Sequence, residues 1–245
     1  MTANSSGETL DTILDGRLAL VQPSRGYRFS IEAILLGRFV RAGTRDRVLE
    51  LGAGCGIISI MIAALHRPRA VVAIEIQPPL AAMIARSAAL NGLEAVNAVC
   101  ADLRHKKIAG VESASFDLVV ANPPFRAAAA GRENPDRSRR LARGESAAVL
   151  LDFVAAARRY ARSGARVAFV LTARRSAELI SAMRSHQLEP KRIRFVHPRL
   201  ARPASVMLIE ARVGGGIEVT IEPPLILYER PGICTAEAQA LLSSP

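Results

Sequence analysis

The chain has 245 residues, of which 50% are hydrophobic, and its 33 Lys and Arg against 22 Asp and Glu give a formal net charge of +11. This composition excludes a largely disordered chain, and no apolar run reaches the roughly 18 residues that a membrane-spanning helix needs. The positive balance favours a polyanionic partner, nucleic acid first, although a GC-rich genome also raises arginine content without any function.

The N-terminal residues carry Glu8 and Asp11 and no basic residue before the first apolar stretch, so we expect no secretory signal. The three cysteines, Cys55, Cys100 and Cys234, are far apart, and neither a CxxC motif nor a Cys/His ligand spacing occurs. We therefore expect a cytoplasmic protein without a structural metal ion.

The first predicted elements are a hairpin and a helix. Residues 12–22, TILDGRLALVQ, place Asp15-Gly16 between two apolar stretches, which predicts a hairpin with a type I′ turn. Ser30 is placed to cap a helix over residues 31–40, IEAILLGRFV. We expect a single domain over 1–245, in which residues 1–41 form a hairpin and helix extension and residues 42–245 form the core.

From residue 47 short apolar runs alternate with helical segments. The runs of buried-strand type are RVLELGA (47–53), AVVAIEI (70–76), AVNAVCA (95–101), FDLVVA (116–121) and ARVAFVLT (165–172). The helical segments between them cover residues 57–66, 79–92 and 146–164. This order predicts an α/β fold with a mostly parallel, doubly wound sheet.

The last quarter of the chain has a different pattern. After a helical segment at 176–186, the strand-like runs RIRFVHP, SVMLIEARV and IEVTIEPPLILY follow one another directly, which predicts antiparallel strands at the sheet edge. Residues 126–145, RAAAAGRENPDRSRRLARGE, form the single irregular segment, and their length and polarity are typical of a functional loop.

The glycine-rich segment ELGAGCG, residues 50–56, lies between a predicted strand and a predicted helix. Its glycines allow a tight turn and a close approach of backbone N–H groups to a ligand. A dinucleotide-binding GxGxxG motif would need glycine where Ile57 stands, and no phosphate-loop Gly-Lys-Ser/Thr occurs. The acidic Glu50 before the turn would repel phosphate but can accept hydrogen bonds from an amino group.

Two more acidic residues follow at the ends of the next strands. Glu75 ends AVVAIEI, where a carboxylate can accept from both hydroxyls of a ribose, and Asp102 follows the third strand, placed to meet an adenine edge. Each alone is more often a solvated strand end. Together they predict a ligand with an amino group, a ribose and an adenine but no phosphate, which fits S-adenosylmethionine.

The fourth strand ends in Asn122-Pro123-Pro124-Phe125. Two prolines after an apolar run can simply terminate a strand. In open α/β sheets, however, ligands bind at the carboxyl ends of strands. Asn122 supplies a side-chain carbonyl, Pro123 a backbone carbonyl without an N–H, and Phe125 a face on which a planar group can stack. Two acceptors on one conjugated amine favour its pyramidalisation and free its lone pair for attack on a methyl group, which is catalysis by positioning and electrostatics.

These motifs resemble those of the class I S-adenosylmethionine-dependent amino methyltransferases. The segments LDGRLALVQPSRGYRFSIEAILLGRFV and PLILYERPGICTAEAQALL are similar to the bacterial tRNA (adenine-N6) methyltransferase family, whose members act on the adenosine 3′ of the anticodon in a valine tRNA. The resemblance runs from about residue 10 to 242. It implies a Rossmann-like fold with a seven-stranded, mostly parallel sheet and antiparallel edge strands, and it implies S-adenosylmethionine as cofactor and RNA as partner.

The resemblance also assigns roles to residues of this chain. Asn122 to Phe125 would hold the target amine. The cofactor would contact Glu50, Gly52, Ala53, Gly54, Gly56, Glu75, Ile76, Asp102, Leu103 and Asn122. Two positions depart from the family pattern: Glu32 stands where Asp is usual, and Phe125 stands where Tyr is frequent. Phe125 keeps the guanine-N2 methyltransferases of ribosomal RNA as an alternative.

Basic and aromatic residues near these motifs are candidates for substrate binding. Arginines of the irregular segment would bind phosphates beside the target base, and GYRFS with the arginine before it offers a surface for an unstacked base or a lid over the cofactor. The simpler alternatives are that the arginines belong to a solvated surface and that the aromatic residues pack in the core. The candidates are Arg25, Tyr27, Arg28, Phe29, Arg126, Arg132 and Arg143.

Two further functions share some of these features. A methyltransferase of a protein glutamine amide would present a similar planar amine, but the charge of +11 and the lack of a separate N-terminal helical domain argue against it. A non-catalytic RNA-binding module could keep the fold, but the intact ELGAGCG and NPPF argue against lost chemistry.

Overall fold

The computed structural model describes residues 3–4, 7–25, 30–124 and 135–243, and gives only the backbone of 3–4 and 135–147. Seven long strands form its centre: β4 (Arg47–Leu51), β5 (Ala70–Glu75), β6 (Val96–Cys100), β7 (Phe116–Ala121), β8 (Ala161–Thr172), β9 (Leu188–His197) and β10 (Val206–Val213). They lie in the order β9-β10-β8-β7-β4-β5-β6. The seven strands expected from the sequence are therefore present, and two short edge strands extend the sheet to nine.

The strand directions also follow the prediction, with one correction at the edge. The strands from β6 to β8 are parallel, and β10 pairs antiparallel with both β8 and β9. Two short strands, β11 (Thr220–Ile221) and β12 (Leu225–Ile226), join β9 in parallel rather than antiparallel orientation. The prolines at 223–224 separate them because proline cannot donate to a strand ladder.

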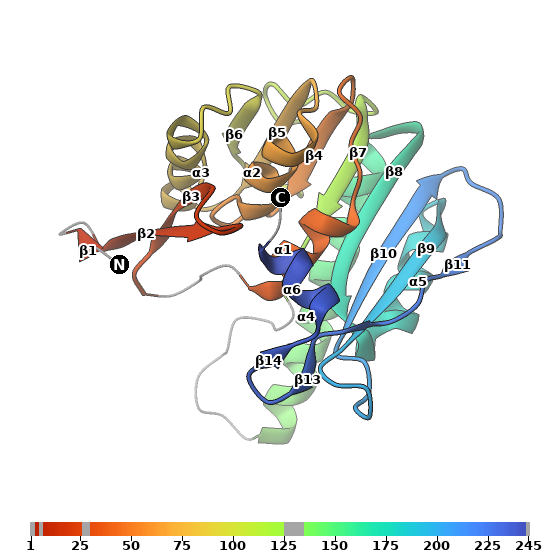
Figure 1. The fold of residues 1–245 in the computed structure, drawn as a ribbon. Helices are drawn as coiled ribbons and strands as arrows, with labels where there is room; N and C mark the ends of the chain where they lie inside the picture. The colour runs from red at the N-terminus through yellow and green to blue at the C-terminus, as the bar shows by residue number, and fades with distance from the viewer. Residues whose placement is uncertain (1–2, 5–6, 26–29, 125–134, 244–245) are drawn as a thin grey trace.

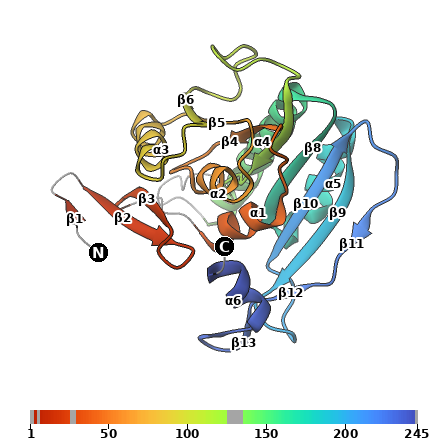
Figure 2. The same ribbon diagram turned by 45° about the horizontal axis from the view of Figure 1, so that its top comes forward.

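Six helices in the described part of the chain accompany these strands: α1 (Ile31–Phe39), α2 (Ile57–His66), α3 (Pro78–Leu90), α4 (Pro135–Tyr160), α5 (Ser176–Ser185) and α6 (Ala236–Ser243). One apolar core joins α1, α2 and α6 to one face of the sheet, and a second joins α4 and α5 to the other. Figures 1 and 2 show α1 and α6 on the opposite side of the sheet from α5. The sheet is thus covered on both faces, as its continuous apolar strands require.

The N-terminal hairpin consists of β2 (Glu8–Ile13) and β3 (Leu18–Pro23), with β1 (Ala3–Asn4) beside β2. Asp15 and Gly16 have φ values of 53° and 83°, the two positive angles that a type I′ turn needs. The hairpin docks along α3 rather than joining the central sheet (Figure 2). Ser87 Oγ of α3 accepts from Val21 N at 3.0 Å, and the Asn91 amide exchanges two hydrogen bonds with the backbone of Ala19.

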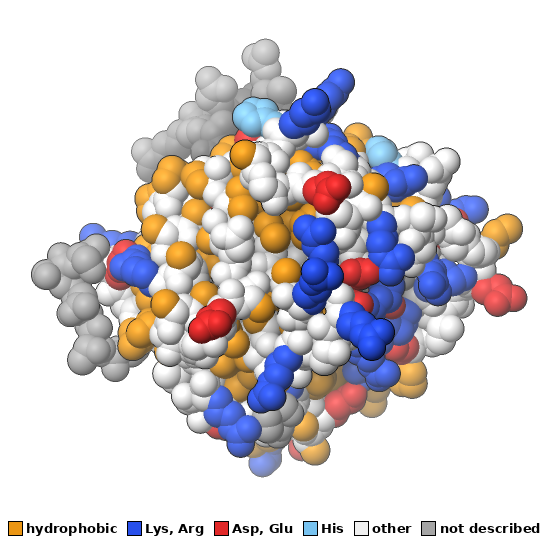
Figure 3. All heavy atoms as spheres, turned by 90° about the horizontal axis from the view of Figure 1, so that it is seen from above, with side chains coloured by type: hydrophobic (Ala, Val, Ile, Leu, Met, Phe, Trp, Pro, Cys, Tyr) orange, Lys and Arg blue, Asp and Glu red, His pale blue; other side chains and the backbone are white. Residues whose placement is uncertain are grey.

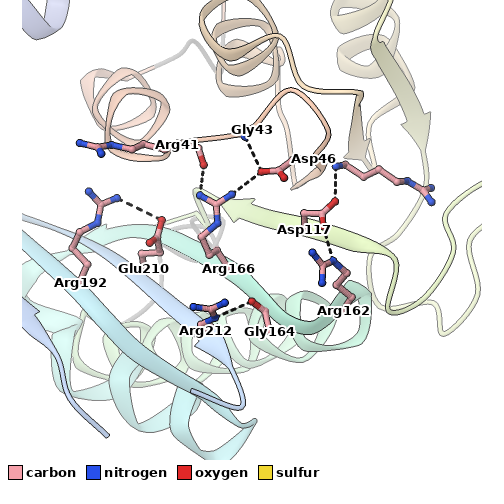
Figure 4. A network of polar contacts seen from close by, with 11 residues as sticks. Arg41, Gly43, Asp46, Asp117, Arg162, Gly164, Arg166, Arg192, Glu210 and Arg212 are labelled. Carbon is pink, nitrogen blue, oxygen red and sulfur yellow. Dashed lines mark hydrogen bonds and ion pairs between the residues drawn. The ribbon is translucent and has the colours of Figure 1, made fainter. Parts of the chain in front are cut away.

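Arginines tie the extension to the core (Figure 4). Arg166 of β8 donates to the backbone carbonyl of Arg41 and, at 2.7 Å, to the Asp46 carboxylate. Arg192 of β9 donates to the Phe39 carbonyl at 2.7 Å, and its guanidinium carbon lies 3.9 Å from the centroid of the Phe39 ring. The end of α1 is therefore fixed to strands that follow it by more than a hundred residues.

Both ends of α4 and the cap of α1 differ from the sequence prediction. Helix α4 starts at Pro135, so residues 135–145, expected to be irregular, are helical. It ends at Tyr160 instead of 164, because β8 begins at once with Ala161 beside β7. Ser30 occupies the N-cap position of α1 as expected, but its side chain makes no capping hydrogen bond. The chain's last strands, β13 (Tyr228–Arg230) and β14 (Ile233–Cys234), form a small separate hairpin before α6.

Candidate active site

The glycine segment follows β4 and turns into α2. Gly52, Gly54 and Gly56 have φ values of 64°, 57° and 83°, a region that residues with a side chain rarely adopt. Two of them also permit close packing. A Cβ on Gly52 would lie 2.7 Å from Cζ of Phe153, and one on Gly56 would lie 2.8 Å from Cγ1 of Ile84. The glycines thus let α3 and α4 approach this turn closely.

Glu75 at the end of β5 holds the middle of the glycine segment. Its Oε2 accepts from Gly54 N at 2.8 Å, and its Oε1 accepts from Gln77 N at 2.9 Å. The residue is only 5% exposed, yet it lines a pocket at the carboxyl ends of the strands. Its carboxylate therefore both fixes the turn and faces the space where a ligand can bind.

Glu50 has a different environment. It is 1% exposed, and its Oε2 accepts from both the backbone N–H and the hydroxyl of Ser59 in the first turn of α2. Burial raises the pKa of Glu50 to about 8, and the nearby Glu75 charge adds to the effect. Glu50 does not line the pocket. Its contacts position the start of α2 beneath the glycine turn.

A pocket of about 390 Å³ opens at the carboxyl ends of β4 to β7. It brings together seven of the ten residues predicted from the sequence to bind the cofactor, and one proline of the NPP segment. The seven are Gly52, Gly54, Glu75, Ile76, Asp102, Leu103 and Asn122, of which Asn122 is also predicted to hold the target amine. Pro124 lies beside them, whereas Glu50, Ala53, Gly56 and Pro123 do not line the pocket.

Asp102 is held by its neighbour Arg104. Arg104 donates to both carboxylate oxygens of Asp102, at 3.0 Å from Nε to each, and these hydrogen bonds lower the pKa of Asp102 to about 2. The side chain of Asp102 is 16% exposed and that of Arg104 is 63% exposed. Asp102 is therefore ionised at neutral pH, and Arg104 orients its carboxylate at the pocket.

The NPP segment begins directly after β7. Asn122 and Pro124 line the pocket, and Pro123 between them is buried. No hydrogen bond between the described residues involves the Asn122 side chain, which lies at the pocket wall. The position of this segment at the same strand edge as the glycine turn agrees with the arrangement expected from the sequence.

Several predicted residues lie outside the described part of the chain. Phe125, Tyr27, Arg28, Phe29, Arg126 and Arg132 belong to this group, and Arg143 lies in the portion of α4 for which only the backbone is described. Arg25 is described and exposed, just after β3. Gln22 of β3 lies 3.7 Å from the Cys55 sulfur of the glycine segment, which places the end of the hairpin close to the site.

Other residues that line the pocket were not predicted from the sequence. Phe153 closes it from α4 and packs on the glycine turn, and Asp152 adds a third acidic side chain. In the sequence, the one indication that Phe153 and Asp152 could reach the site was their position on a helix that follows the NPP segment. The remaining missed residues are Ile74, Gln77, Leu80, Ala101, Arg104 and Val149.

The described residues provide neither a cluster of metal ligands nor a helix suited to a membrane. They contain no group of three or more His, Cys, Asp or Glu side chains arranged to hold a metal ion. None of their helices has the length and apolar character that crossing a bilayer requires.

Comparison with known proteins connects this pocket to a chemistry. The family model described as "Methyltransferase small domain" matches residues 31–187, more than half of the chain. A tRNA1(Val) (adenine(37)-N6)-methyltransferase of Parabacteroides distasonis is 28% identical over 184 residues, which cover 73% of this chain and 74% of that protein. A protein of the same name from Aeromonas hydrophila is 25% identical over 209 residues, 82% of each chain.

Solved structures share the fold. A crystal structure described as a predicted O-methyltransferase, protein Atu636 from Agrobacterium tumefaciens, matches with a TM-score of 0.69 and 24% identity, covering 85% of this chain and 94% of that one. The structure of M. jannaschii TYW2 in complex with AdoMet matches with a TM-score of 0.57 and 15% identity, covering 86% and 88%. At these identities the likeness establishes the arrangement of strands and helices.

Proposed function

The chain belongs to the methyltransferase small domain family, and we propose that it transfers a methyl group from S-adenosylmethionine to the exocyclic N6 amine of adenine in a tRNA. The observation that carries the proposal is the meeting of Asn122 with Glu75 and Asp102 in one pocket beside the glycine turn. The curated relatives, which are named for this reaction on adenine 37 of a valine tRNA, support the choice of base and RNA.

The pocket fits the methyl donor. Carboxylates of Glu75 and Asp102 would accept hydrogen bonds from ribose hydroxyls and the adenine edge, and apolar side chains such as Ile76 and Leu103 would flank the planar ring. The same carboxylates would repel a phosphorylated cofactor. S-adenosylmethionine bound here supplies an electrophilic methyl group on a sulfonium.

The residues of the NPP segment act on the acceptor amine. In the proposed reaction the Asn122 side-chain carbonyl and the Pro123 backbone carbonyl accept the two hydrogens of the adenine N6 amine, and the Phe125 ring stacks on the base. These contacts favour a pyramidal nitrogen with a free lone pair. Because they strengthen as the nitrogen becomes positively charged, they stabilise the transition state more than the bound substrate.

Glu50 and Phe153 support this arrangement without contacting the acceptor. Glu50 fixes the first turn of α2 through Ser59, and Phe153 packs on Gly52. We propose that residues 1–245 act as one methyltransferase domain, with residues 1–41 as an extension whose hairpin ends near the glycine segment through Gln22. We also propose that the reaction takes place in the cytoplasm, where its tRNA substrate is found.

The proposal is tested by the destination of a labelled methyl group. Purified protein and labelled S-adenosylmethionine would be incubated separately with total tRNA, total rRNA and total protein from a strain that lacks this enzyme. We expect label in tRNA, recovered as N6-methyladenosine after nuclease digestion and mass spectrometry. Label in rRNA as N2-methylguanosine, or in protein as a methylated glutamine, would instead identify one of the alternative acceptors.

A further inference from the structure

A run of four basic residues begins two positions after Asp102. Arg104, His105, Lys106 and Lys107 are all exposed, and we call them the basic segment 104–107. The composition of the chain does not account for it. Arginine dominates the positive charge elsewhere, yet two of the only three lysines in the sequence stand side by side here, the third being Lys191.

The backbone of this segment is held in place. Arg159 near the end of α4 donates through Nη1 to the carbonyls of Leu103 at 3.2 Å and His105 at 3.0 Å. Immediately after the segment, Ile108 is buried and forms an isolated bridge with Val111, which is also buried. Anchors on both sides therefore present the charges from a fixed backbone, which lowers the ordering cost of binding.

The segment adjoins the cofactor pocket. Arg104 lines that pocket, while His105 and Lys107 line a second hollow of about 280 Å³. The two hollows share Ala101 and Asp102 in their walls. A polymer whose base enters the pocket can therefore reach the second hollow with a neighbouring part of its chain.

The charges of the segment differ in their availability. Arg104 is engaged by Asp102 through charge-assisted hydrogen bonds. Among the residues that the structure describes, no carboxylate forms an ion pair with Lys106 or Lys107. Lysine is a compact point charge on a flexible stem and suits phosphate oxygens approached from several directions.

We propose that the basic segment 104–107 binds the RNA backbone beside the target base, with Lys106 and Lys107 contacting phosphates. This inference rests on the proposed function and identifies the surface that its RNA substrate occupies. Arg104 keeps its partner Asp102, so the segment joins cofactor pocket and RNA surface in a single stretch of chain. Phosphate contacts position a nucleic acid without reading its sequence, and the pocket then selects the base.

The test removes the two lysine charges and compares the effect with that of removing two positive charges from another part of the surface. The variant Lys106→Gln/Lys107→Gln leaves Arg104 and Asp102 intact. Its control is Arg67→Gln/Arg69→Gln, which removes two exposed arginine charges near the amino end of β5, at the opposite edge of the sheet. The dissociation constant for a fluorescent anticodon stem–loop RNA would be measured over a salt series, and that for S-adenosylmethionine by calorimetry.

For the lysine variant we expect the dissociation constant for RNA to rise about 5- to 20-fold near 0.1 M salt. The slope of log affinity against log salt should shrink by about 1.4, or roughly 0.7 for each lost single-strand phosphate contact. The efficiency kcat/KM for RNA should fall by the same factor, and cofactor affinity should stay unchanged. The arginine control should change RNA affinity by less than about twofold, because distant charges are screened by salt.

Equal weakening of RNA binding in both double variants would overturn the inference, since net charge alone would then explain it. A rise in the cofactor dissociation constant that matches the loss of RNA affinity would also overturn it. In either case a wild-type protein that still methylates RNA leaves the proposed function standing. A wild-type protein that neither binds nor methylates RNA would overturn the proposed function and this inference together.

Discussion

Asn122 is the residue on which the proposed chemistry depends most directly. We expect Asn122→Ala to lower kcat for methyl transfer by a factor on the order of 10², comparable to the loss of one group that stabilises charge in a transition state. Cofactor affinity, measured by calorimetry, should stay within about twofold because Glu75 and Asp102 remain. The matched control is Asn97→Ala, which truncates an exposed asparagine in β6. An Asn122→Ala variant as active as this control would remove the amine-binding role.

A comparison of Gly52 with Gly92 distinguishes two effects of adding a side chain at these glycines. One is the strain of a left-handed backbone, and the other is a clash with Phe153. Both have a φ of 64°, but a Cβ would meet Phe153 at 2.7 Å at Gly52 and nothing within 4 Å at Gly92. Gly92→Ala should therefore lower the free energy of unfolding by about 1–2 kcal/mol, because alanine disfavours the left-handed backbone conformation. Gly52→Ala should lower the free energy of unfolding by more than this, and it should also weaken cofactor binding. Equal losses of thermal stability in the two variants would show that the packing of Phe153 on the turn is unimportant.

Glu50 predicts a pH dependence of stability. Burial raises the pKa of Glu50 to about 8 in the folded protein from an ordinary value of 4.5, so the folded state keeps a proton that the unfolded state has lost. The contribution of Glu50 to stability is therefore greatest below the lower value and declines as the pH rises towards the higher one.

A Glu50→Gln variant keeps an oxygen that can accept from Ser59 but has no proton to lose. Its melting temperature relative to wild type should rise steadily between about pH 5 and pH 8. Glu94→Gln, at an exposed carboxyl, serves as the control and should show a constant difference. A constant difference for Glu50→Gln as well would mean that Glu50 is charged throughout this range.

At the scale of elements, the strands were predictable, whereas the docking of the N-terminal hairpin and the start of α4 were not. Buried parallel strands produce continuous apolar runs, so β4 to β8 could be located from sequence to within a few residues. The docking of the β2–β3 hairpin on α3 depends on Ser87 and Asn91, which read as ordinary helix-surface residues. The early start of α4 was missed because its first residues are polar and rich in arginine.

Some residues of the candidate site could be predicted from the sequence, and others could not. Residues that follow strands directly, such as Glu75, Asp102 and Asn122, could be placed because the carboxyl ends of parallel strands share one edge. Phe153 and Asp152 reach the pocket from a helix, and the direction that a helical residue faces depends on packing that the sequence does not reveal. Glu50 faces α2 instead of the pocket, because the side chains of a strand alternate between opposite faces.

The contacts of Arg192 in β9 with Phe39 in α1, which we call the clamp, give a prediction about the N-terminal extension. Arg192 lies over the Phe39 ring, and its guanidinium also pairs with Glu222 at 3.2 Å. We expect Arg192→Met to destabilise the protein by about 1–3 kcal/mol and to speed hydrogen exchange of α1 amides. The control Arg184→Met removes an exposed arginine paired with Glu189 and should change neither measurement. Unaltered exchange in α1 would contradict the clamp.

At the scale of the whole molecule, part of the net charge has a structural use. Figure 3 looks onto the amino ends of the parallel strands, where Lys and Arg side chains form a band with Asp and Glu between them. In the network of Figure 4, Arg162 and Arg166 bond to carboxylates and Arg212 bonds to a backbone carbonyl. The charge of +11 therefore overstates the cations available to RNA, and location decides which of them serve it.

We propose that this pocket methylates the N6 amine of adenine in tRNA. The most direct measurement is mass spectrometry of nucleosides from a valine tRNA transcript, made without modifications and incubated with purified protein and S-adenosylmethionine. We expect N6-methyladenosine in the fragment that contains the anticodon loop, with wild-type protein and not with Asn122→Ala. An unmethylated transcript, or methyl groups found on guanine instead of adenine, would contradict the account.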